Sequence, residues 1–189
     1  MKGTCVDTPM YLGPAKSRII YEPRGIVAIL GSWNYPIYTV LSPLVNAIAA
    51  GNTAIIKPSE LSPFICKKLI NFLRANHDSD SYFMLEGQIE VAKALTNAKV
   101  DMICFTGSTE KGKLVAEAAA KNLVPCLLEL GGKSPLVVDS SASVSFAAKK
   151  IAMAKFVNSG QTCVAPDYVL CHYSVADKLI SELKKAILD

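Results

Sequence analysis

A cysteine in a small, polar loop is the residue of this sequence best suited to covalent chemistry. Cys163 lies in the stretch 156–167, between two apolar segments, and small residues flank it on both sides. Small neighbours leave room for a substrate atom to approach, and the thiolate is the reactive form of the group. Because Lys155 and His172 are the nearest Lys or His residues, any activation must come from residues that the fold brings in. Taken alone, the loop fits a buried structural cysteine better.

Three further groups of polar residues could also do chemistry. Asn34, next to Trp33, could donate its amide to an oxyanion, although a turn-forming asparagine is the simpler interpretation. Lys57 and Glu60 could hold the hydroxyl groups of a ribose, or form a solvated surface pair. Glu129 stands inside an apolar run, where burial would raise the pKa of its carboxyl group and suit it to general-base catalysis. A paired core carboxylate is the alternative for Glu129.

The segment 105–113 could bind an anion. Gly107 lets the backbone come close to a phosphate, and a helix that begins after Ser108, near Thr109, offers unpaired N–H groups. The segment also matches the start of a P-loop, but Leu114 stands where that motif needs a hydroxyl group for Mg²⁺. The dinucleotide fingerprint G-x-G-x-x-G is absent. The segment alone therefore fits an anion site and ordinary helix capping equally well.

Strands alternate with helices along most of the chain, which predicts a parallel sheet covered on both faces. The expected strands are 25–30, 53–56, 82–85, 100–105, 126–129, 135–138 and 169–171. The expected helices are 37–50, 62–76 with Ser62 as its capping residue, 89–97, 109–122, 144–157 and 175–188. Ligands bind at the carboxyl ends of such strands, where the polar groups described above fall, apart from Cys163. Residues 1–22 lack periodicity and are expected to form an arm.

Composition excludes several classes of protein. The chain has 189 residues, is 51% hydrophobic and carries a net charge of +4 without long charged runs, which argues against nucleic-acid binding. Its six cysteines are scattered and are expected to be reduced thiols of a cytoplasmic protein. His77 and His172 stand apart, so no metal site is expected. No apolar stretch approaches the roughly 20 residues that cross a bilayer, and no signal peptide is evident.

Taken together, six motifs resemble those of the aldehyde dehydrogenases. They are SWNYP at 32–36, AAGN at 49–52, KPSE at 57–60, FTGS at 105–108, ELGGKSP at 129–135 and NSGQTC at 158–163. The sequences WNYP and CVAPDY are most similar to the class 3 branch, which acts on fatty and aromatic aldehydes. The resemblance covers nearly the whole chain from Glu22 onward.

This resemblance implies oxidation of an aldehyde to a carboxylic acid. Cys163 matches the family's nucleophile, which attacks the aldehyde carbon. Asn34 matches the asparagine whose side-chain amide, with the backbone N–H of the cysteine, holds the oxyanion. Hydride then passes to the nicotinamide and leaves a thioester. Glu129 matches the glutamate that activates the water for hydrolysis. A soft nucleophile, an oxyanion donor and a base are the groups that this chemistry needs.

The resemblance also implies a site for NAD, with NADP use left open. Lys57 and Glu60 would hold the adenosine ribose, and the start of the helix near Gly107 would meet the pyrophosphate. Glu60 near a 2′-hydroxyl group should favour NAD. The implied cofactor-binding residues are Trp33, Lys57, Glu60, Gly107, Ser108, Thr109, Gly112 and Gly131.

The expected fold class is α/β: a parallel-sheet variant of the Rossmann dinucleotide-binding domain over residues 23–130, then the start of an α/β catalytic domain over 131–189. Residues 1–22 would be the remnant of a missing amino-terminal segment. Family members are much longer, so the expected homodimer belongs to the full-length protein, and membrane contact is expected only if a missing carboxyl-terminal tail exists. The expected partner is a small aldehyde, with no nucleic acid. The alternatives are a truncated, inactive nucleotide-binding remnant and, more distantly, a P-loop nucleotidase.

Overall fold

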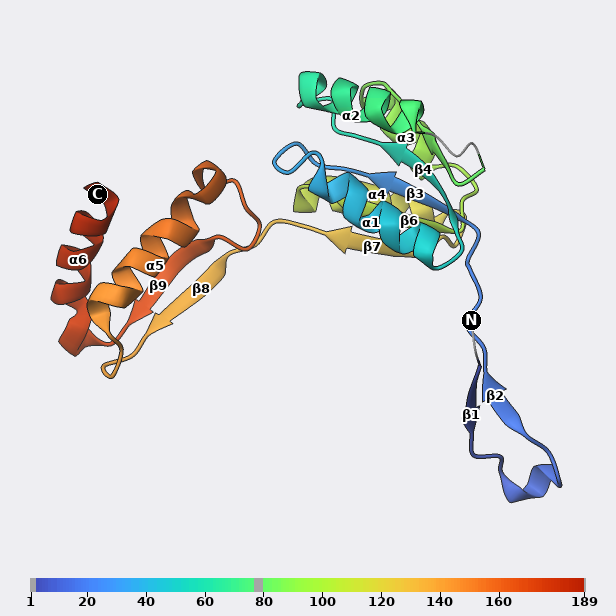
Figure 1. Ribbon diagram of the computed structural model, residues 1–189, viewed down its shortest axis with the longest axis horizontal. Coiled ribbons are helices and arrows are strands. Elements are labelled where there is room, and N and C mark those ends of the chain that lie inside the picture. Colours follow the sequence, from blue (N-terminus) through green and yellow to red (C-terminus); the bar gives the residue numbers. More distant parts are fainter. Residues whose placement is uncertain (1–2, 77–79, 189) are drawn as a thin grey trace. The chain divides into compact units, whose positions relative to one another are not determined.

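The computed structural model describes residues 3–76 and 80–188, so His77 lies outside the described residues. The chain divides into two units, which are described separately (Figure 1). The first comprises Met1–Thr106 and Lys111–Leu128, and the second comprises Gly107–Glu110 and Glu129–Asp189.

A five-stranded sheet forms the centre of the first unit. In spatial order its strands are β5 (Tyr82–Met84), β4 (Thr53–Lys57), β3 (Ile26–Leu30), β6 (Met102–Thr106) and β7 (Cys126–Glu129). β3 pairs in parallel with β4 and β6, and β4 pairs in parallel with β5. The runs of aliphatic residues in β3, β4 and β6 are typical of strands covered on both faces. The predicted α/β fold with a parallel sheet is therefore confirmed.

Two layers of helices cover this sheet. α1 (Tyr38–Ala49) and α2 (Pro63–Ala75) pack on one face, while α3 (Ile89–Thr96) and α4 (Thr109–Ala120) pack on the other. The alternation of side chains along a strand explains the division, because Ile29 contributes to the first layer's core while its neighbours in β3 contribute to the second. Burying each large aliphatic side chain of these cores stabilises the fold by roughly 1.5–3 kcal/mol.

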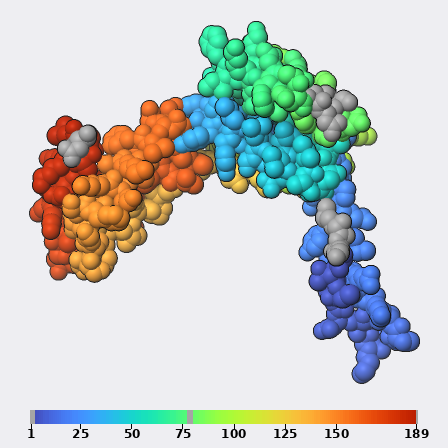
Figure 2. Space-filling view, in the orientation of Figure 1, coloured from blue at the N-terminus to red at the C-terminus, as the bar shows by residue number. Residues whose placement is uncertain are grey.

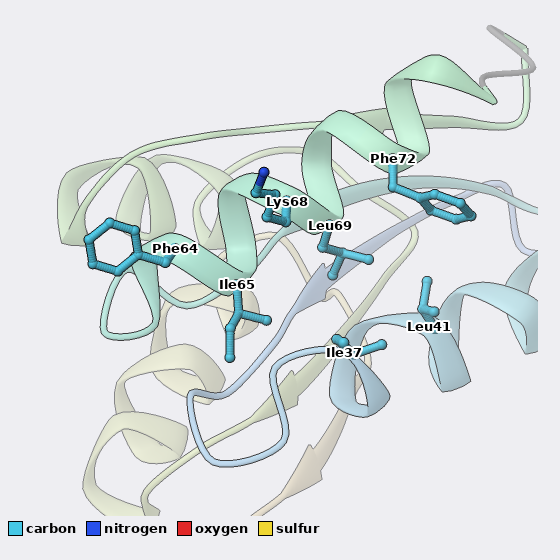
Figure 3. Close-up of a pocket in the computed structure, with 7 residues that line it drawn as sticks. All are labelled: Ile37, Leu41, Phe64, Ile65, Lys68, Leu69 and Phe72. Atoms are coloured by element: carbon cyan, nitrogen blue, oxygen red, sulfur yellow. The ribbon is translucent and has the colours of Figure 1, made fainter.

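An apolar groove of about 490 Å³ lies between α1 and α2 on the outside of the first unit (Figure 3). From α2, Ile65, Leu69 and Phe72 point toward Ile37 and Leu41 of the facing segment. None of the predicted site residues lines this groove.

A parallel pair of strands forms the second unit's sheet. β8 (Ser134–Val138) pairs with β9 (Pro166–Cys171). α5 (Val144–Phe156) and α6 (Ala176–Leu188) cover one face of the pair. The buried core of this face consists of Val138, Val144, Ala148, Ile151 and Leu179.

The other face of β8 and β9 is apolar and open. Val137 is 72% exposed and Leu170 is 54% exposed, and both point away from the helices. Parallel strands are usually covered on both faces. The second unit therefore presents an apolar surface that its own helices do not cover.

The first residues form a hairpin that the sequence did not predict. β1 (Thr4–Val6) pairs antiparallel with β2 (Ser17–Ile19), and a short 3₁₀ helix at Met10–Leu12 joins them. In Figure 2 the dark blue side chains of this segment form a narrow arm. Met10 and Tyr11 are 95% and 86% exposed.

Most predicted boundaries lie within two residues of the observed ones, but one capping prediction is wrong. Ser62 precedes α2 and Pro63 occupies its first turn as predicted, yet the Ser62 side chain makes no capping hydrogen bond. Its hydroxyl group donates instead to the carbonyl oxygen of Trp33 over 2.9 Å. β9 begins at Pro166, three residues before its predicted start. Within residues 3–76 and 80–188, no helix has the length and apolar character needed to cross a bilayer.

Candidate active site

The loops after β3 and β4 are tied together at the carboxyl edge of the first unit's sheet. The N–H of Gly31 donates to the carbonyl oxygen of Lys57 over 3.0 Å, and the bond from Ser62 to Trp33 joins the two loops again. A Cβ at Gly31 would lie 2.5 Å from Cγ2 of Val40, so this position in the loop accepts only glycine without rearrangement. Sequence reasoning missed Gly31, although a glycine directly after a buried strand was the available signal.

Hydrogen bonds within the first of these loops fix the amide of Asn34. The hydroxyl group of Ser32 donates to Asn34 Oδ1 over 2.6 Å, and the N–H of Ser32 donates to Thr39 Oγ1 over 3.0 Å. Thr39 Oγ1 in turn donates to the carbonyl oxygen of Tyr35 over 3.0 Å. Because Ser32 is only 7% exposed, its bond to Oδ1 is shielded from water. The amide's acceptor end is thus held within the loop, which defines the opposite end as the donor.

Lys57 and Glu60 form a close ion pair. Lys57 Nζ lies 2.6 Å from Glu60 Oε2 and donates to the carbonyl oxygen of Pro58 over 3.0 Å. The Lys57 side chain is only 3% exposed, whereas that of Glu60 is 37% exposed. Partial burial raises the pKa of Glu60, but the Lys57 hydrogen bond, a backbone hydrogen bond and the charges of Lys57 and Lys111 outweigh it, so the net pKa is lowered. Glu60 therefore offers an ionised, accessible acceptor.

The start of α4 is connected to the end of β7. The N–H of Gly107 donates to the carbonyl oxygen of Glu129 over 3.0 Å, and Thr109 is the first residue of α4 after Ser108. Gly112 lies one turn further on, in the buried stripe of the helix that includes Val115. Gly112 is therefore buried against the core, and contact of residues 107–112 with a cofactor stays a prediction.

Glu129 is exposed, contrary to the expectation that its apolar run would bury it. β7 is an edge strand, and its side chains alternate between the two faces. Cys126 and Leu128 pack against the core, so Leu127 and Glu129 point away from it. Apolar neighbours in sequence therefore do not enclose this carboxylate, and the argument for a base activated by burial does not hold in this chain.

Cys163 is exposed at the tip of a tight turn, which argues against a buried structural cysteine. The N–H of Ala165 donates to the carbonyl oxygen of Thr162 over 3.0 Å and closes this turn around Cys163 and Val164. Ala165 is 7% exposed, whereas Val164 is 73% exposed. The turn is thus anchored at its far end and presents the thiol to solvent.

A left-handed segment precedes the turn. Asn158, Ser159 and Gly160 have φ values of 51°, 55° and 74°. A non-glycine residue in this conformation typically costs about 1–3 kcal/mol, so Asn158 and Ser159 are strained. The N–H and the side chain of Gln161 both donate to the carbonyl oxygen of Asn158, over 3.1 and 3.0 Å. Sequence reasoning identified a loop at these positions but not its strained conformation.

The thiols of Cys66 and Cys126 are poorly suited to act as nucleophiles. Burial raises the pKa of both groups, and Cys66 Sγ also donates to the carbonyl oxygen of Ser59 over 3.1 Å. A raised pKa lowers the fraction of thiolate at neutral pH. Among residues 3–76 and 80–188, no cluster of three or more His, Cys, Asp or Glu side chains could hold a metal ion.

Comparison with known proteins places these features in a family. The model of the aldehyde dehydrogenase family matches residues 6–188 of the chain. The chain therefore belongs to the aldehyde dehydrogenase family, as the six motifs predicted.

Curated relatives support the class 3 branch. The chain is 50% identical over 182 residues to 4,4'-diaponeurosporen-aldehyde dehydrogenase of Staphylococcus aureus, covering 96% of this chain and 40% of the relative. It is 47% identical to aldehyde dehydrogenase family 3 member A2 of Rattus norvegicus, covering 89% of this chain and 35% of the relative. It is 46% identical to the dimeric NADP-preferring aldehyde dehydrogenase of Mus musculus, covering 89% of this chain and 37% of the relative. The chain thus spans less than half the length of these relatives.

Solved structures agree with the fold. A substrate-bound aldehyde dehydrogenase of Staphylococcus aureus matches with a TM-score of 0.93 and 48% identity, covering 98% of this chain and 41% of that one. A Mycobacterium tuberculosis aldehyde dehydrogenase complexed with NAD+ matches with a TM-score of 0.88 and 29% identity, covering 98% of this chain and 38% of that one.

Proposed function

We propose that this chain supplies the dinucleotide-binding and nucleophile-bearing parts of a class 3 aldehyde dehydrogenase, which oxidises an aldehyde to a carboxylic acid with NAD or NADP. The observation that carries the proposal is the exposed thiol of Cys163 on a hydrogen-bonded turn, within a chain of this family. Residues 23–130 form the NAD(P)-binding domain in this proposal, residues 131–189 form the first part of the catalytic domain, and residues 1–22 form an arm.

In the proposed reaction Cys163 acts as the nucleophile. Its thiolate attacks the aldehyde carbon and forms a thiohemiacetal, whose oxyanion accepts hydrogen bonds from the Asn34 amide and the backbone N–H of Cys163. When bound, the nicotinamide supplies the acceptor for the hydride that leaves this carbon. Glu129 then takes a proton from the water that attacks the remaining thioester, which releases the acid and the free thiol. The Ser32 bond supports the role of Asn34, because it defines the donor end of that amide.

In this proposal two groups of residues hold different parts of the dinucleotide. Glu60 is an ionised acceptor suited to ribose hydroxyl groups, and Lys57 beside it is a donor of the opposite charge. The N–H groups at the start of α4, after Gly107 and Ser108, suit a pyrophosphate. The carboxylate of Glu60 disfavours a 2′-phosphate, whereas the charges of Lys57 and Lys111 offset it, so we propose that both NAD and NADP bind, with NAD preferred.

The proposed substrate is a small aldehyde of the fatty or aromatic class, and the whole protein is proposed to form a homodimer. The name of the Mus musculus relative, which includes the word dimeric, supports the second statement. The cytoplasmic location stays a prediction from the sequence.

A specific observation favours a second candidate, in which the chain binds nucleotide without turnover. The observation is the open apolar face of β8 and β9, where Val137 and Leu170 are exposed. Hydride transfer is favoured in a site that is closed to bulk solvent. A chain with this open face would therefore retain cofactor binding while lacking a closed aldehyde site.

One experiment tests both candidates. The purified chain and the complete enzyme are mixed with NAD or NADP and a panel of aliphatic and aromatic aldehydes, and formation of the reduced cofactor is followed by absorbance. Turnover by both supports the first candidate for the chain itself. Cofactor binding without turnover by the chain, but turnover by the complete enzyme, supports the second. Failure of the complete enzyme to reduce either cofactor would overturn the proposed function.

A further inference from the structure

The loop before β8 runs alongside the loop that carries Cys163. Ser134 at the start of β8 is paired with Pro166 at the start of β9, so the two parallel strands begin side by side. Lys133 Nζ and Asp167 Oδ1 approach to 3.4 Å across the same gap. Gly132 lies two residues before Ser134, beside the turn that contains Cys163.

At Gly132 these two loops approach closely. A Cβ built on Gly132 would lie 2.6 Å from the carbonyl oxygen of Cys163 and 3.7 Å from its carbonyl carbon. Ordinary contacts of this kind are 3.4–4 Å. The obstructing atom belongs to the backbone, so it cannot rotate away as the tip of a side chain can. At the neighbouring Gly131, by contrast, a Cβ would meet nothing within 4 Å.

We propose that Gly132 is a positioning residue for Cys163, because its missing side chain is what lets the nucleophile's carbonyl group lie against the loop before β8. The hydrogen bond from the N–H of Ala165 to Thr162 fixes the turn that contains Cys163. The backbone of Gly132 lies against the carbonyl group of Cys163 on the other side. The left-handed residues before Gln161 fix the direction from which the chain enters the turn. The inference rests on the proposed role of Cys163 as the nucleophile.

An alanine at position 132 would push the carbonyl group of Cys163 away by roughly the difference between 2.6 Å and an ordinary contact. The Cys163 peptide group would have to rotate, and the hydrogen bond from Ala165 to Thr162 would be strained. Misplacement of a reacting group by about 1 Å can lower a rate about 100-fold. The same substitution at Gly131 meets open space and is the matched control for the hydrogen-exchange measurement, which uses no cofactor.

Amide hydrogen exchange measured by NMR on the purified chain tests the geometry without cofactor or aldehyde. In Gly132→Ala, the Ala165 amide should exchange at least tenfold faster than in the wild type, while in Gly131→Ala it should be unchanged. The amide of Ile29, in the central strand of the other unit, should exchange at the same rate in all three proteins and so reports general destabilisation. Equal Ala165 exchange in Gly132→Ala and wild type would overturn the inference.

If Gly132→Ala does not fold, the exchange rate of the Ala165 amide in the wild-type chain still tests the inference. The inference requires the Ala165 amide to exchange at least tenfold more slowly than in an unstructured peptide, and exchange at the unstructured rate overturns it.

The complete enzyme supplies the second readout. Gly132→Ala should lower kcat about 100-fold while the Kd for the cofactor stays within twofold. Ser181→Ala, on the exposed surface of α6, is the control and should leave both quantities unchanged. A fall in cofactor affinity equal to the fall in kcat would indicate a structural role and overturn the inference. This failure is distinct from failure of the proposed function, which would show as aldehyde oxidation that persists in Cys163→Ala.

Discussion

The Lys57–Glu60 pair and the Cys163 turn are held in place by different means. The ion pair depends on side chains: Lys57 is almost fully buried, and its ammonium group contacts a carboxylate and a carbonyl oxygen. The Cys163 thiol is exposed, and its position depends on backbone turns and on a glycine beside it. Substitutions can weaken an ion pair by different amounts. A backbone turn, by contrast, either keeps its conformation or changes to another one. The cofactor end of the proposed site should therefore respond gradually to mutation, and the nucleophile end abruptly.

The largest expected effect is at the nucleophile itself. In the complete enzyme Cys163→Ala should lower aldehyde oxidation at least about 10⁴-fold, because the variant lacks the thiol proposed to form the thioester, while NAD still binds. Steady-state rates and cofactor titration by fluorescence measure the two quantities. Cys171→Ala, in the same unit, is the control and should keep its activity. Wild-type rates of reduced-cofactor formation in Cys163→Ala would remove Cys163 from the mechanism.

Next in size is Glu129→Gln, which should separate the two chemical steps. Loss of the base should slow thioester hydrolysis about 10²–10⁴-fold while hydride transfer is spared. Rapid mixing should therefore show a burst of reduced cofactor equal to the enzyme concentration, followed by slow turnover. Glu129→Asp retains a carboxylate and should recover part of the steady-state rate. A variant that loses the burst together with the turnover would assign Glu129 to an earlier step.

A smaller effect is expected at Ser32. Ser32→Ala removes the donor to Asn34 Oδ1, so the amide can turn and present its oxygen to the oxyanion. We expect kcat to fall about tenfold, less than the roughly 10²–10³-fold that follows loss of an oxyanion donor, with the cofactor Kd unchanged. Ser181→Ala, on the surface of α6, is the control. An unchanged kcat would show that Asn34 is oriented without Ser32.

The smallest effect concerns the ionisation of Glu60. Its pKa is lowered in the folded chain from an ordinary value of 4.5, so the stabilisation from its charged form is present above that pH and is lost as the pH falls through the folded pKa. The free energy of unfolding of the wild type should exceed that of Glu60→Gln near neutral pH, by less than about 1 kcal/mol because Glu60 is partly exposed. Urea denaturation should show the two converging below pH 4.5. A difference that is independent of pH would contradict this.

The sequence predicted the scaffold well because local signals and the fold agree. Helix 37–50 was expected and Tyr38–Ala49 is observed, and Gly51 after it has a φ of 81°, which favours glycine. The positions of the buried strands along the chain followed from their aliphatic runs. These features depend on periodicity and on residues that end elements, both of which are visible in a short stretch of sequence.

Features that depend on contacts distant in sequence were missed. The exposure of Glu129 follows from the edge position of β7, which no neighbouring residue reveals. Ser62 faces the carbonyl oxygen of Trp33, 29 positions away, instead of its own helix. The approach of Gly132 to Cys163 arises only when two strands start together. The residues with chemical functional groups were visible in the sequence, but the groups that orient them were not.

The hairpin of β1 and β2 has a practical consequence. Two strands without further cover are marginally stable in water, and Lys16 and Arg18 lie in or beside the second of them. Brief trypsin digestion should therefore cut there before it reaches the sheet of the first unit. The trimmed product would begin close to β3, and its melting temperature, compared with that of the whole chain, would measure what the arm contributes to the stability of the first unit.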